Sequence, residues 1–369
     1  MTREELLSEA KEGITQSKYL ILELITGYGK TKLAIDCVNY NIDTTNKINP
    51  SILILVAKSV HKQTWMDEID KWGGIKSNNI TIECYNSLYK YRSKSFDYII
   101  ADEMHHLSDN RMEYLKTINI TKFIGLSATI KQDMMFYFKN ILHAKVIKCG
   151  IKEAVEDEVL PSPTVYLWPL TLDSKDIKYT VTQFNKSITT TQRGAYKIMS
   201  KEIEWYRNRR GSVAMKRVWL HKAKERLNWL SVQKEEILEK LLHSLKNERI
   251  LLFCSSIAQT QRMCKNSITS KSKNANTILD KFNKNKIKHI SAVDILNEGV
   301  NLVDCRIGIF GVINASEIMS KQKVGRLLRH KSPIVIIPYF KDTREEEIVA
   351  NIITEYDSKN VKPFSEFML

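Results

Sequence analysis

Short, unbroken apolar runs separated by helix-like segments are the feature of this chain that most restricts its fold. In the first 150 residues these runs occur at Tyr19–Leu24, Ile52–Val56, Ile80–Cys84, 98–101 and 123–126. Amphipathic, helix-like patterns lie between them, for example at 32–38 and 61–72. Strands that are apolar on both faces are typical of parallel sheets covered by helices on each side. The sequence therefore predicts an α/β fold, in which ligands bind beyond the carboxyl ends of the strands.

The second half of the chain repeats this alternation. Residues 151–163 form an acidic helical turn followed by two prolines, which indicates a linker. Further strands are predicted at 164–172 and at RILLFCS, IKHISAV, RIGIFGV and PIVIIPY. A chain of 369 residues is too long for one typical domain. We therefore expect one α/β domain at 1–150 and a second at 164–369, with a basic helical insertion at about 183–245.

The formal net charge of +15 indicates a polyanionic partner, above all nucleic acid. The alternative is compositional, because Lys-, Asn- and Ile-rich chains are typical of AT-rich phage and bacterial genomes. No apolar run approaches the ~20 residues of a membrane span, and the charged N-terminus has no signal-peptide core. Six scattered cysteines read as reduced thiols. We therefore expect no membrane partner and a location in the cytoplasm of a bacterium or a phage-infected host cell.

The motif TGYGKT follows the first predicted strand directly. Its glycines allow a tight turn in which backbone N–H groups face an anion. Lys30 would reach the β- and γ-phosphates of a nucleotide, and the Thr31 hydroxyl would ligate Mg²⁺. The predicted nucleotide-binding loop consists of Thr26, Gly27, Tyr28, Gly29, Lys30 and Thr31.

The motif ADEMHH places two carboxylates side by side at the end of a predicted strand. Adjacent carboxylates repel each other unless they share a cation, although a polar strand-to-helix turn is the plainer alternative. With Mg²⁺ held at Thr31, Asp102 would be a second ligand of that ion, and Glu103 would orient and polarise the attacking water. His105 would then sense the γ-phosphate.

Two later segments offer further candidates. GLSATI carries Ser127 and Thr129, which would hydrogen-bond to the acidic loop, although such residues are also ordinary turn formers. QKVGRLLRH carries Gln322 and places Arg326 and Arg329 on one helical face. Guanidinium groups held in this way stabilise phosphoryl transfer from across a cleft, and a basic surface helix is the alternative.

In this order, the motifs resemble those of the superfamily 2 helicases. TGYGKT resembles motif I, ADEMHHL motif II in its DExH form, GLSAT motif III and VGRLLR motif VI. The stretches LNEGVNL and KAKERLNWL are similar to the branch that holds the phage UvsW-type helicases and the motor subunits of type I and III restriction enzymes. Leu24 and Met104 depart from motifs I and II, and the upstream adenine-reading glutamine has no clear counterpart except Gln16.

The resemblance implies two RecA-like domains in tandem, with ATP and Mg²⁺ between them and nucleic acid across both. It implies translocation on or unwinding of a duplex more than RNA-specific work. Because the adenine-reading glutamine lacks a clear counterpart, we do not expect a strict preference for ATP over other triphosphates. Because neither end offers an accessory domain, we expect a minimal motor. Lys58 would approach the nucleic-acid backbone. The domain interface would include Glu298, Gly299 and Asn301.

The predicted insertion interleaves basic and aromatic residues, as surfaces that track a nucleic-acid strand do. Its candidate nucleic-acid contacts are Arg207, Arg209, Arg210, Lys216 and Arg217. The alternative is that the aromatic residues pack the helices onto the second domain. Three other functions also stay open: an RNA helicase, a nucleotide-gated clamp that grips nucleic acid without unwinding it, and a motor subunit of a larger nuclease complex.

Overall fold

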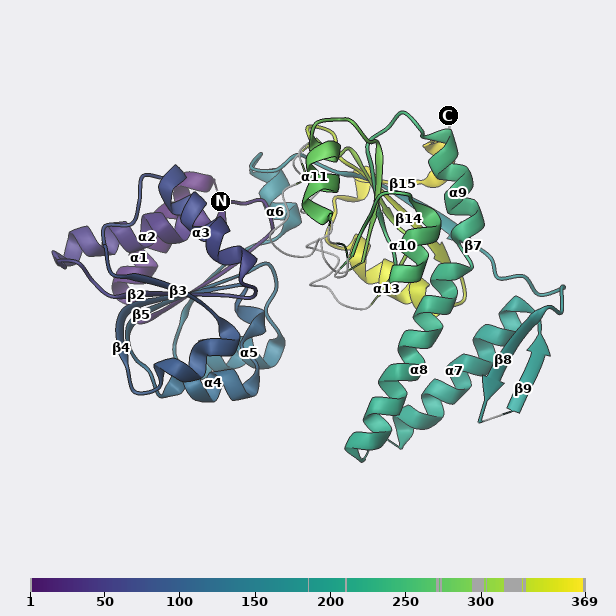
Figure 1. Ribbon diagram of the computed structural model, residues 1–369, viewed down its shortest axis with the longest axis horizontal. Coiled ribbons are helices and arrows are strands. Elements are labelled where there is room, and N and C mark those ends of the chain that lie inside the picture. Colours follow the sequence, from purple (N-terminus) through teal and green to yellow (C-terminus); the bar gives the residue numbers. More distant parts are fainter. Residues whose placement is uncertain are drawn as a thin grey trace. The chain divides into compact units, whose positions relative to one another are not determined.

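The computed structural model describes residues 2–184, 186–209, 211–269, 272, 274–293, 302, 304–314, 327 and 330–367. The chain divides into two compact units, the first running to Ser162 and the second starting at Pro163. The segment predicted as a linker contains a short helix, α6 (Ile151–Glu156), which groups with the first unit. Each unit is built around its own parallel sheet (Figure 1).

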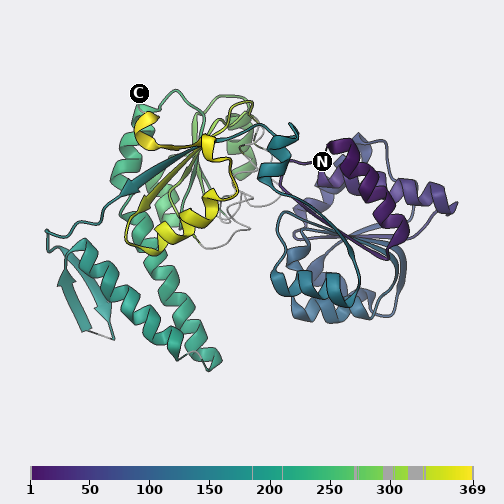
Figure 2. The same ribbon diagram turned by 180° about the vertical axis from the view of Figure 1, so that it is seen from behind.

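The described part of the first unit contains a six-stranded parallel sheet in the order β3-β2-β4-β5-β1-β6. Its strands are β1 (Tyr19–Leu24), β2 (Ile52–Val56), β3 (Ile80–Cys84), β4 (Ser95–Asp102), β5 (Asn119–Ser127) and β6 (Lys145–Cys149). Helices α1 (Arg3–Gln16), α2 (Lys30–Thr45) and α3 (Val60–Lys71) lie on one side, and α4 (Asp109–Lys116) and α5 (Gln132–Phe136) on the other (Figures 1 and 2). This double cover explains why β2 is buried at every position.

The described part of the second unit holds a seven-stranded parallel sheet in the order β11-β12-β10-β13-β14-β7-β15. Its strands are β7 (Thr164–Leu170), β10 (Ile250–Phe253), β11 (Ser267–Ile268), β12 (His289–Ala292), β13 (Ile307–Phe310), β14 (Ile334–Phe340) and β15 (Val361–Pro363). Outside an insertion, the described helices of this unit are α9 (Glu235–Ser244), α10 (Ile257–Met263), α11 (Ala275–Asn283) and α13 (Arg344–Ile353). The predicted fold class, two parallel-sheet α/β domains in tandem, is confirmed.

Between β7 and α9 the chain forms a projection of residues 179–232, which we call the arm. It consists of an antiparallel hairpin, β8 (Tyr179–Gln183) and β9 (Lys186–Thr190), and two long helices, α7 (Gln192–Asn208) and α8 (Val213–Val232). Figures 1 and 2 show α7 and α8 side by side, with the hairpin lying along α7. Trp229 of α8 packs beside a buried cluster that includes Leu172, Tyr196 and Phe340. At this position the packing alternative for the aromatic residues applies.

No helix among the described residues is long and apolar enough to cross a membrane. All six cysteines lie within the described ranges, and none of them forms a disulfide. Five are buried, and only Cys84 is partly accessible.

Candidate nucleotide-binding site

The TGYGKT loop connects β1 to α2 and folds as a turn that depends on its glycines. Gly27 and Gly29 have φ angles of 98° and 94°, in the left-handed region that glycine tolerates best. Because Gly29 makes this turn, α2 starts at Lys30, slightly earlier than the sequence pattern predicts. Gly29, the N-cap residue of α2, has no side chain that could cap the helix. The N–H groups of the first helical turn are therefore available to an anion.

Three polar side chains of this loop lie within or beside the turn. Lys30 Nζ donates a hydrogen bond of 3.1 Å to the carbonyl oxygen of Leu24, which keeps the ammonium group inside the loop. Thr26 Oγ1 and the Tyr28 hydroxyl are buried, and neither has a hydrogen-bond partner among the described residues. Burial raises the pKa of Tyr28 to about 12. Buried polar groups of this kind usually mark a place where a polar ligand completes the hydrogen bonding.

Asp102 is the last residue of β4, and Glu103 follows it at the same edge of the sheet. Asp102 pairs with Leu126 of β5, and Leu126 pairs with Leu22 of β1, so Asp102 is level with a residue near the end of β1, at the carboxyl edge from which the phosphate loop leaves the sheet. Burial raises the pKa of the Asp102 carboxyl to about 6, and the negative charge of Glu103 adds to the rise. A cation at this position would offset both effects.

The residue that follows Asp102 has a constrained backbone. Glu103 has φ 49° and ψ 56°, in the left-handed region, which turns the chain sharply into a short 3-10 helix, Met104–His106. Non-glycine residues in this region are uncommon and cluster at functional sites. Met104 packs over Gly125 so closely that a Cβ built on Gly125 would lie 2.4 Å from its sulfur. The glycine of GLSAT therefore makes room for the acidic motif.

The predicted coupling residues of the first unit lie close together. His105 Nδ1 is 3.1 Å from Ser127 Oγ and 3.4 Å from Glu103 Oε2. Ser127 Oγ in turn donates to the carbonyl oxygen of Thr129 at 2.8 Å. A continuous polar path therefore runs from the carboxylate of Glu103 to the loop after β5.

Two aromatic residues hold Asp102 and were not predicted from the sequence. Trp65 Nε1 of α3 donates to Asp102 Oδ2 at 2.9 Å. The Tyr85 hydroxyl donates to the backbone carbonyl of Asp102 at 2.7 Å. Their separation from Asp102 along the chain gives no local signal.

A pocket of about 240 Å³ lies beside the phosphate loop, between the first turns of α1 and α2. Its lining includes Arg3, Leu7 and Tyr28, and the Arg3 guanidinium lies against Gly29. Gln16 lies at the opposite end of α1, where it donates to Glu12 at 2.7 Å. Gln16 therefore lies away from this pocket, which borders the first turn of α1. Arg3 was missed, since nothing in the sequence links it to the loop.

The remaining candidates are distributed over both units. Lys58 is exposed after β2, at the carboxyl edge of the first sheet. Exposed residues of the arm include Arg207, Arg209, Lys216 and Arg217. The other candidates lie outside the described residues: Arg210, Glu298, Gly299, Asn301, Gln322, Arg326 and Arg329.

The residues at the carboxyl edge fit a nucleotide with its metal ion. Within the described ranges, no group of three or more His, Cys, Asp or Glu side chains could hold a metal by itself. A hard cation there would take the Thr31 hydroxyl, the Asp102 carboxylate and phosphate oxygens, as Mg²⁺ does in phosphoryl-transfer sites. The glycine turn, the uncapped helix and the buried Thr26 hydroxyl suit the phosphates.

Two family models match the chain. The model described as the res subunit of type III restriction enzymes matches residues 2–132, and that of the helicase conserved C-terminal domain matches residues 233–331. The chain is a superfamily 2 helicase. It is an ATPase of this superfamily, related to the motor subunits of restriction enzymes, as its motifs predicted.

A curated relative and several solved structures agree with this family. The DNA 3'-5' translocase XPB2 of Sulfurisphaera tokodaii is 25% identical over 366 residues, which cover 88% of this chain and 78% of that protein. The helicase domain of Hef from Pyrococcus furiosus superposes with a TM-score of 0.53 at 14% identity, covering 95% of this helicase and 97% of Hef.

Two further structures share the fold. A fragment assigned as an HsdR subunit of a type I restriction enzyme from Vibrio vulnificus has a TM-score of 0.65 at 17% identity, covering 98% of this helicase and 67% of the fragment. Dbp5 of S. cerevisiae, bound to RNA and ADP BeF3, has a TM-score of 0.61 at 11% identity, covering 97% and 89%. At these identities the likeness establishes the two-domain RecA-like fold.

Proposed function

We propose that this helicase hydrolyses ATP with Mg²⁺ and uses the free energy to move along, unwind or remodel duplex or branched DNA. The observation that carries the proposal is the shared carboxyl edge of the sheet, where the TGYGKT loop and the Asp102–Glu103 pair lie and where the charge of Lys30 acts on the Asp102 carboxyl. The relative named a DNA translocase, matched over 88% of this chain, supports DNA as the track. We place this activity in the cytoplasm of a bacterium or a phage-infected cell.

The chain's own groups divide the work at the nucleotide. Lys30 and the first-turn N–H groups of α2 bind the phosphates, and Thr31 and Asp102 hold the ion. The bound Mg²⁺ supplies neutralisation of phosphate charge. Trp65, through its 2.9 Å hydrogen bond, fixes the orientation of the Asp102 carboxylate. Glu103 orients the attacking water and accepts its proton.

The polar path from Glu103 through His105 to Ser127 would report the state of the γ-phosphate to the loop after β5. His105 lies 3.4 Å from the Glu103 carboxylate and 3.1 Å from the Ser127 hydroxyl, so a shift of the carboxylate alters both contacts. Arg326 and Arg329 would contribute guanidinium groups from the other domain, with Gln322 beside them. The match to the helicase C-terminal domain spans all three residues and supports this assignment.

The nucleotide base would occupy the pocket beside the phosphate loop. The pocket lining is Arg3, Glu4, Leu7, Tyr28, Gly29, Lys32, Leu33 and Asp36, which includes no side-chain amide to read both edges of adenine. We therefore expect GTP to be hydrolysed at a rate within about tenfold of the ATP rate, because one lost hydrogen bond costs only about 0.5–1.5 kcal/mol. Steady-state hydrolysis of the four nucleoside triphosphates measures this preference, and more than a thousandfold selection of ATP would contradict it.

The test of the proposed function measures ATP hydrolysis with single-stranded DNA, duplex DNA, branched DNA and RNA in parallel. We expect DNA to stimulate the rate more than RNA. Lys30→Ala and Glu103→Gln should each lower the stimulated rate by about 10²–10³-fold or more, because each removes a group that acts on the transferring phosphoryl.

Lys240→Ala and Glu236→Gln are the matched controls, since these residues form an exposed ion pair on α9. Retained turnover in both Lys30→Ala and Glu103→Gln would exclude the mechanism. Stimulation by RNA alone would assign the RNA-helicase alternative. ATP-dependent binding to a fork without release of a strand would assign the clamp.

A further inference from the structure

Three aromatic side chains form an exposed cluster on the arm. Phe184 lies at the turn of the β8–β9 hairpin, and its ring centroid is 5.1 Å from that of Trp205 and 6.2 Å from that of Tyr206. The Trp205 and Tyr206 rings are 4.9 Å apart and nearly perpendicular. Phe184 is 46% exposed and Trp205 is 37% exposed. Solvent contact of two large rings costs hydrophobic free energy, which suggests that something covers them during function.

The fold fixes this cluster on the arm. Phe184 has φ 44°, a left-handed conformation that is rare for a bulky residue, and its N–H donates to Glu202 Oε1 at 3.4 Å. Val181 of β8 is buried, and Gln183 holds the hairpin to α7 through a 3.5 Å hydrogen bond to the carbonyl oxygen of Ile198. The exposed ring is therefore presented by a constrained turn.

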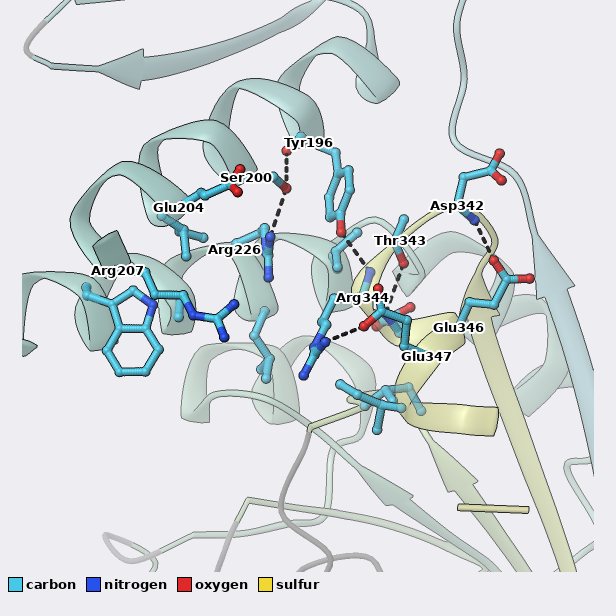
Figure 3. Close-up of a pocket in the computed structure, with 18 residues that line it drawn as sticks. Tyr196, Ser200, Glu204, Arg207, Arg226, Asp342, Thr343, Arg344, Glu346 and Glu347 are labelled. Atoms are coloured by element: carbon cyan, nitrogen blue, oxygen red, sulfur yellow. Dashed lines mark hydrogen bonds and ion pairs between the residues drawn. The ribbon is translucent and has the colours of Figure 1, made fainter. Parts of the chain in front are cut away.

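Contacts at the base of the arm join it to the second sheet domain (Figure 3). Arg226 of α8 donates to Ser200 of α7 at 2.8 Å, and the Tyr196 hydroxyl accepts from the backbone N–H of Arg344 at 2.7 Å. Burial lowers the pKa of Arg226. These hydrogen bonds connect α7, α8 and the start of α13, so the arm should move together with its domain.

Positive charge lies against the aromatic cluster. The Arg209 guanidinium is 4.2 Å from the centroid of the Trp205 ring, and Lys186 is exposed two residues after Phe184, whereas Arg207 lines the pocket between α7 and α8. Of the carboxylates on α7, Glu202 is buried against Lys222, and Glu204 is exposed. Aromatic faces with cationic neighbours are the chemistry that binds unpaired nucleobases, because the rings stack on bases and the cations meet phosphates.

We propose that Phe184, Trp205 and Tyr206 form a stacking site for unpaired DNA bases, such as those at a fork or bubble. The proposal rests on the proposed function, since it assumes a DNA track. It adds a contact that depends on base stacking and distinguishes unpaired from paired DNA, whereas arginine–phosphate contacts serve both. A protein partner is the competing occupant of the same rings.

The experiment compares binding to a duplex and to the same duplex with an unpaired bubble that carries 2-aminopurine. Phe184→Ala and Trp205→Ala should lower affinity for the bubble by about 5- to 150-fold, the loss expected for one base stack, and should abolish quenching of 2-aminopurine on binding. Trp205→Phe should restore most of the affinity and the quenching, because it keeps an aromatic face. Circular dichroism and thermal melting of each variant report its folding.

Phe136→Ala and Trp72→Ala are the matched controls, since Phe136 is 61% exposed, Trp72 is 37% exposed, and both lie in the first unit. An unchanged ratio of bubble to duplex affinity in folded Phe184→Ala and Trp205→Ala would overturn the stacking site and assign the rings to a protein contact. If the proposed function itself fails, the wild-type chain neither binds DNA nor hydrolyses ATP faster in its presence. A wild-type chain that does both therefore shows that only the stacking site has failed.

Discussion

The position of Asp102 and its surroundings favour different protonation states. Its position at the carboxyl edge suits a metal ligand, but burial and the adjacent Glu103 raise its pKa to about 6, from a model-peptide value of 3.8. Without a bound cation, the folded chain holds a proton on Asp102 more tightly than the unfolded chain does. The carboxyl therefore destabilises the metal-free fold progressively as the pH rises from about 4 through 6, and costs nothing below that window.

Asp102→Asn should stabilise the metal-free protein at neutral pH by about 1–3 kcal/mol, because the amide removes the buried charge and can still accept from Trp65. The gain should shrink as the pH falls toward 4. Urea unfolding in a chelator at several pH values measures it, and the same variant should lose ATP hydrolysis. If Asp102→Asn instead lowers the free energy of unfolding by the same amount at every pH, the charge of the carboxylate does not destabilise the metal-free fold.

At the scale of single residues, local sequence patterns identified the members of each motif. They missed the residues that hold those members in place. Lys30, Thr31, Asp102 and Glu103 lie at the end of a strand or in the segment after it, so the rule that parallel strands present ligand groups at their carboxyl ends was enough to select them. Arg3 reaches the loop only through the packing of α1, which no local pattern encodes. The roles of Arg326 and Arg329 stay predictions.

Strands were predictable where the sequence carries a clear apolar run. The bounds of β1, β2 and β3 agree with these runs, although β3 is an edge strand that is half-buried throughout. The edge strand β6 was missed, because Lys145 and Lys148 interrupt its pattern and face solvent. The short strands β11 and β15, which flank the second sheet, also lack an apolar run.

A buried ion pair joins the start of α9, just after the arm, to α13, the helix after β14. Lys234 Nζ lies 2.6 Å from Glu345 Oε1, and neither side chain is more than 4% exposed. Burial lowers the pKa of Lys234. Glu345 also accepts from the N–H of Phe340 at 2.9 Å, so one carboxylate connects α9, β14 and α13.

Lys234→Met should destabilise the second unit by about 3–5 kcal/mol, because it leaves the Glu345 carboxylate buried without its cation. Lys240→Met removes an exposed pair on the same helix and should cost less than about 1 kcal/mol. Urea unfolding followed by limited proteolysis of the arm measures both. Equal effects of the two substitutions would mean that the buried pair contributes no more than a surface one.

At the scale of the whole molecule, the net charge of +15 should make the affinity for nucleic acid fall as the ionic strength rises. If Arg207 and Arg209 neutralise phosphates, each substitution to alanine should lower the magnitude of the slope of log K against log salt by about 0.9. Titrations of a fluorescent duplex at several salt concentrations give the slope. Lys240→Ala, on α9 outside the arm, should leave it unchanged, and identical slopes for all variants would remove the arm from the interface.

The presence of two α/β domains, and their order, could be predicted from the alternation of strands and helices along the chain. The order of strands within each sheet did not, because pairing is decided by contacts between segments far apart in the sequence. The insertion was expected to be helical and basic, yet its β8–β9 hairpin was not predicted. The hairpin's polar, threonine-rich strands have too few apolar residues to signal a sheet.

The buried thiols have a practical consequence for labelling chemistry. Burial raises the pKa of Cys37 and Cys305 to about 12 and that of Cys149 and Cys264 to about 11, so these sulfurs hold too little thiolate to react with maleimides. Once the partly accessible Cys84 is replaced by serine, Gly211→Cys would offer a reactive handle between α7 and α8, where a new Cβ meets nothing within 4 Å. A dye attached there would follow the arm through each catalytic cycle in single-molecule fluorescence.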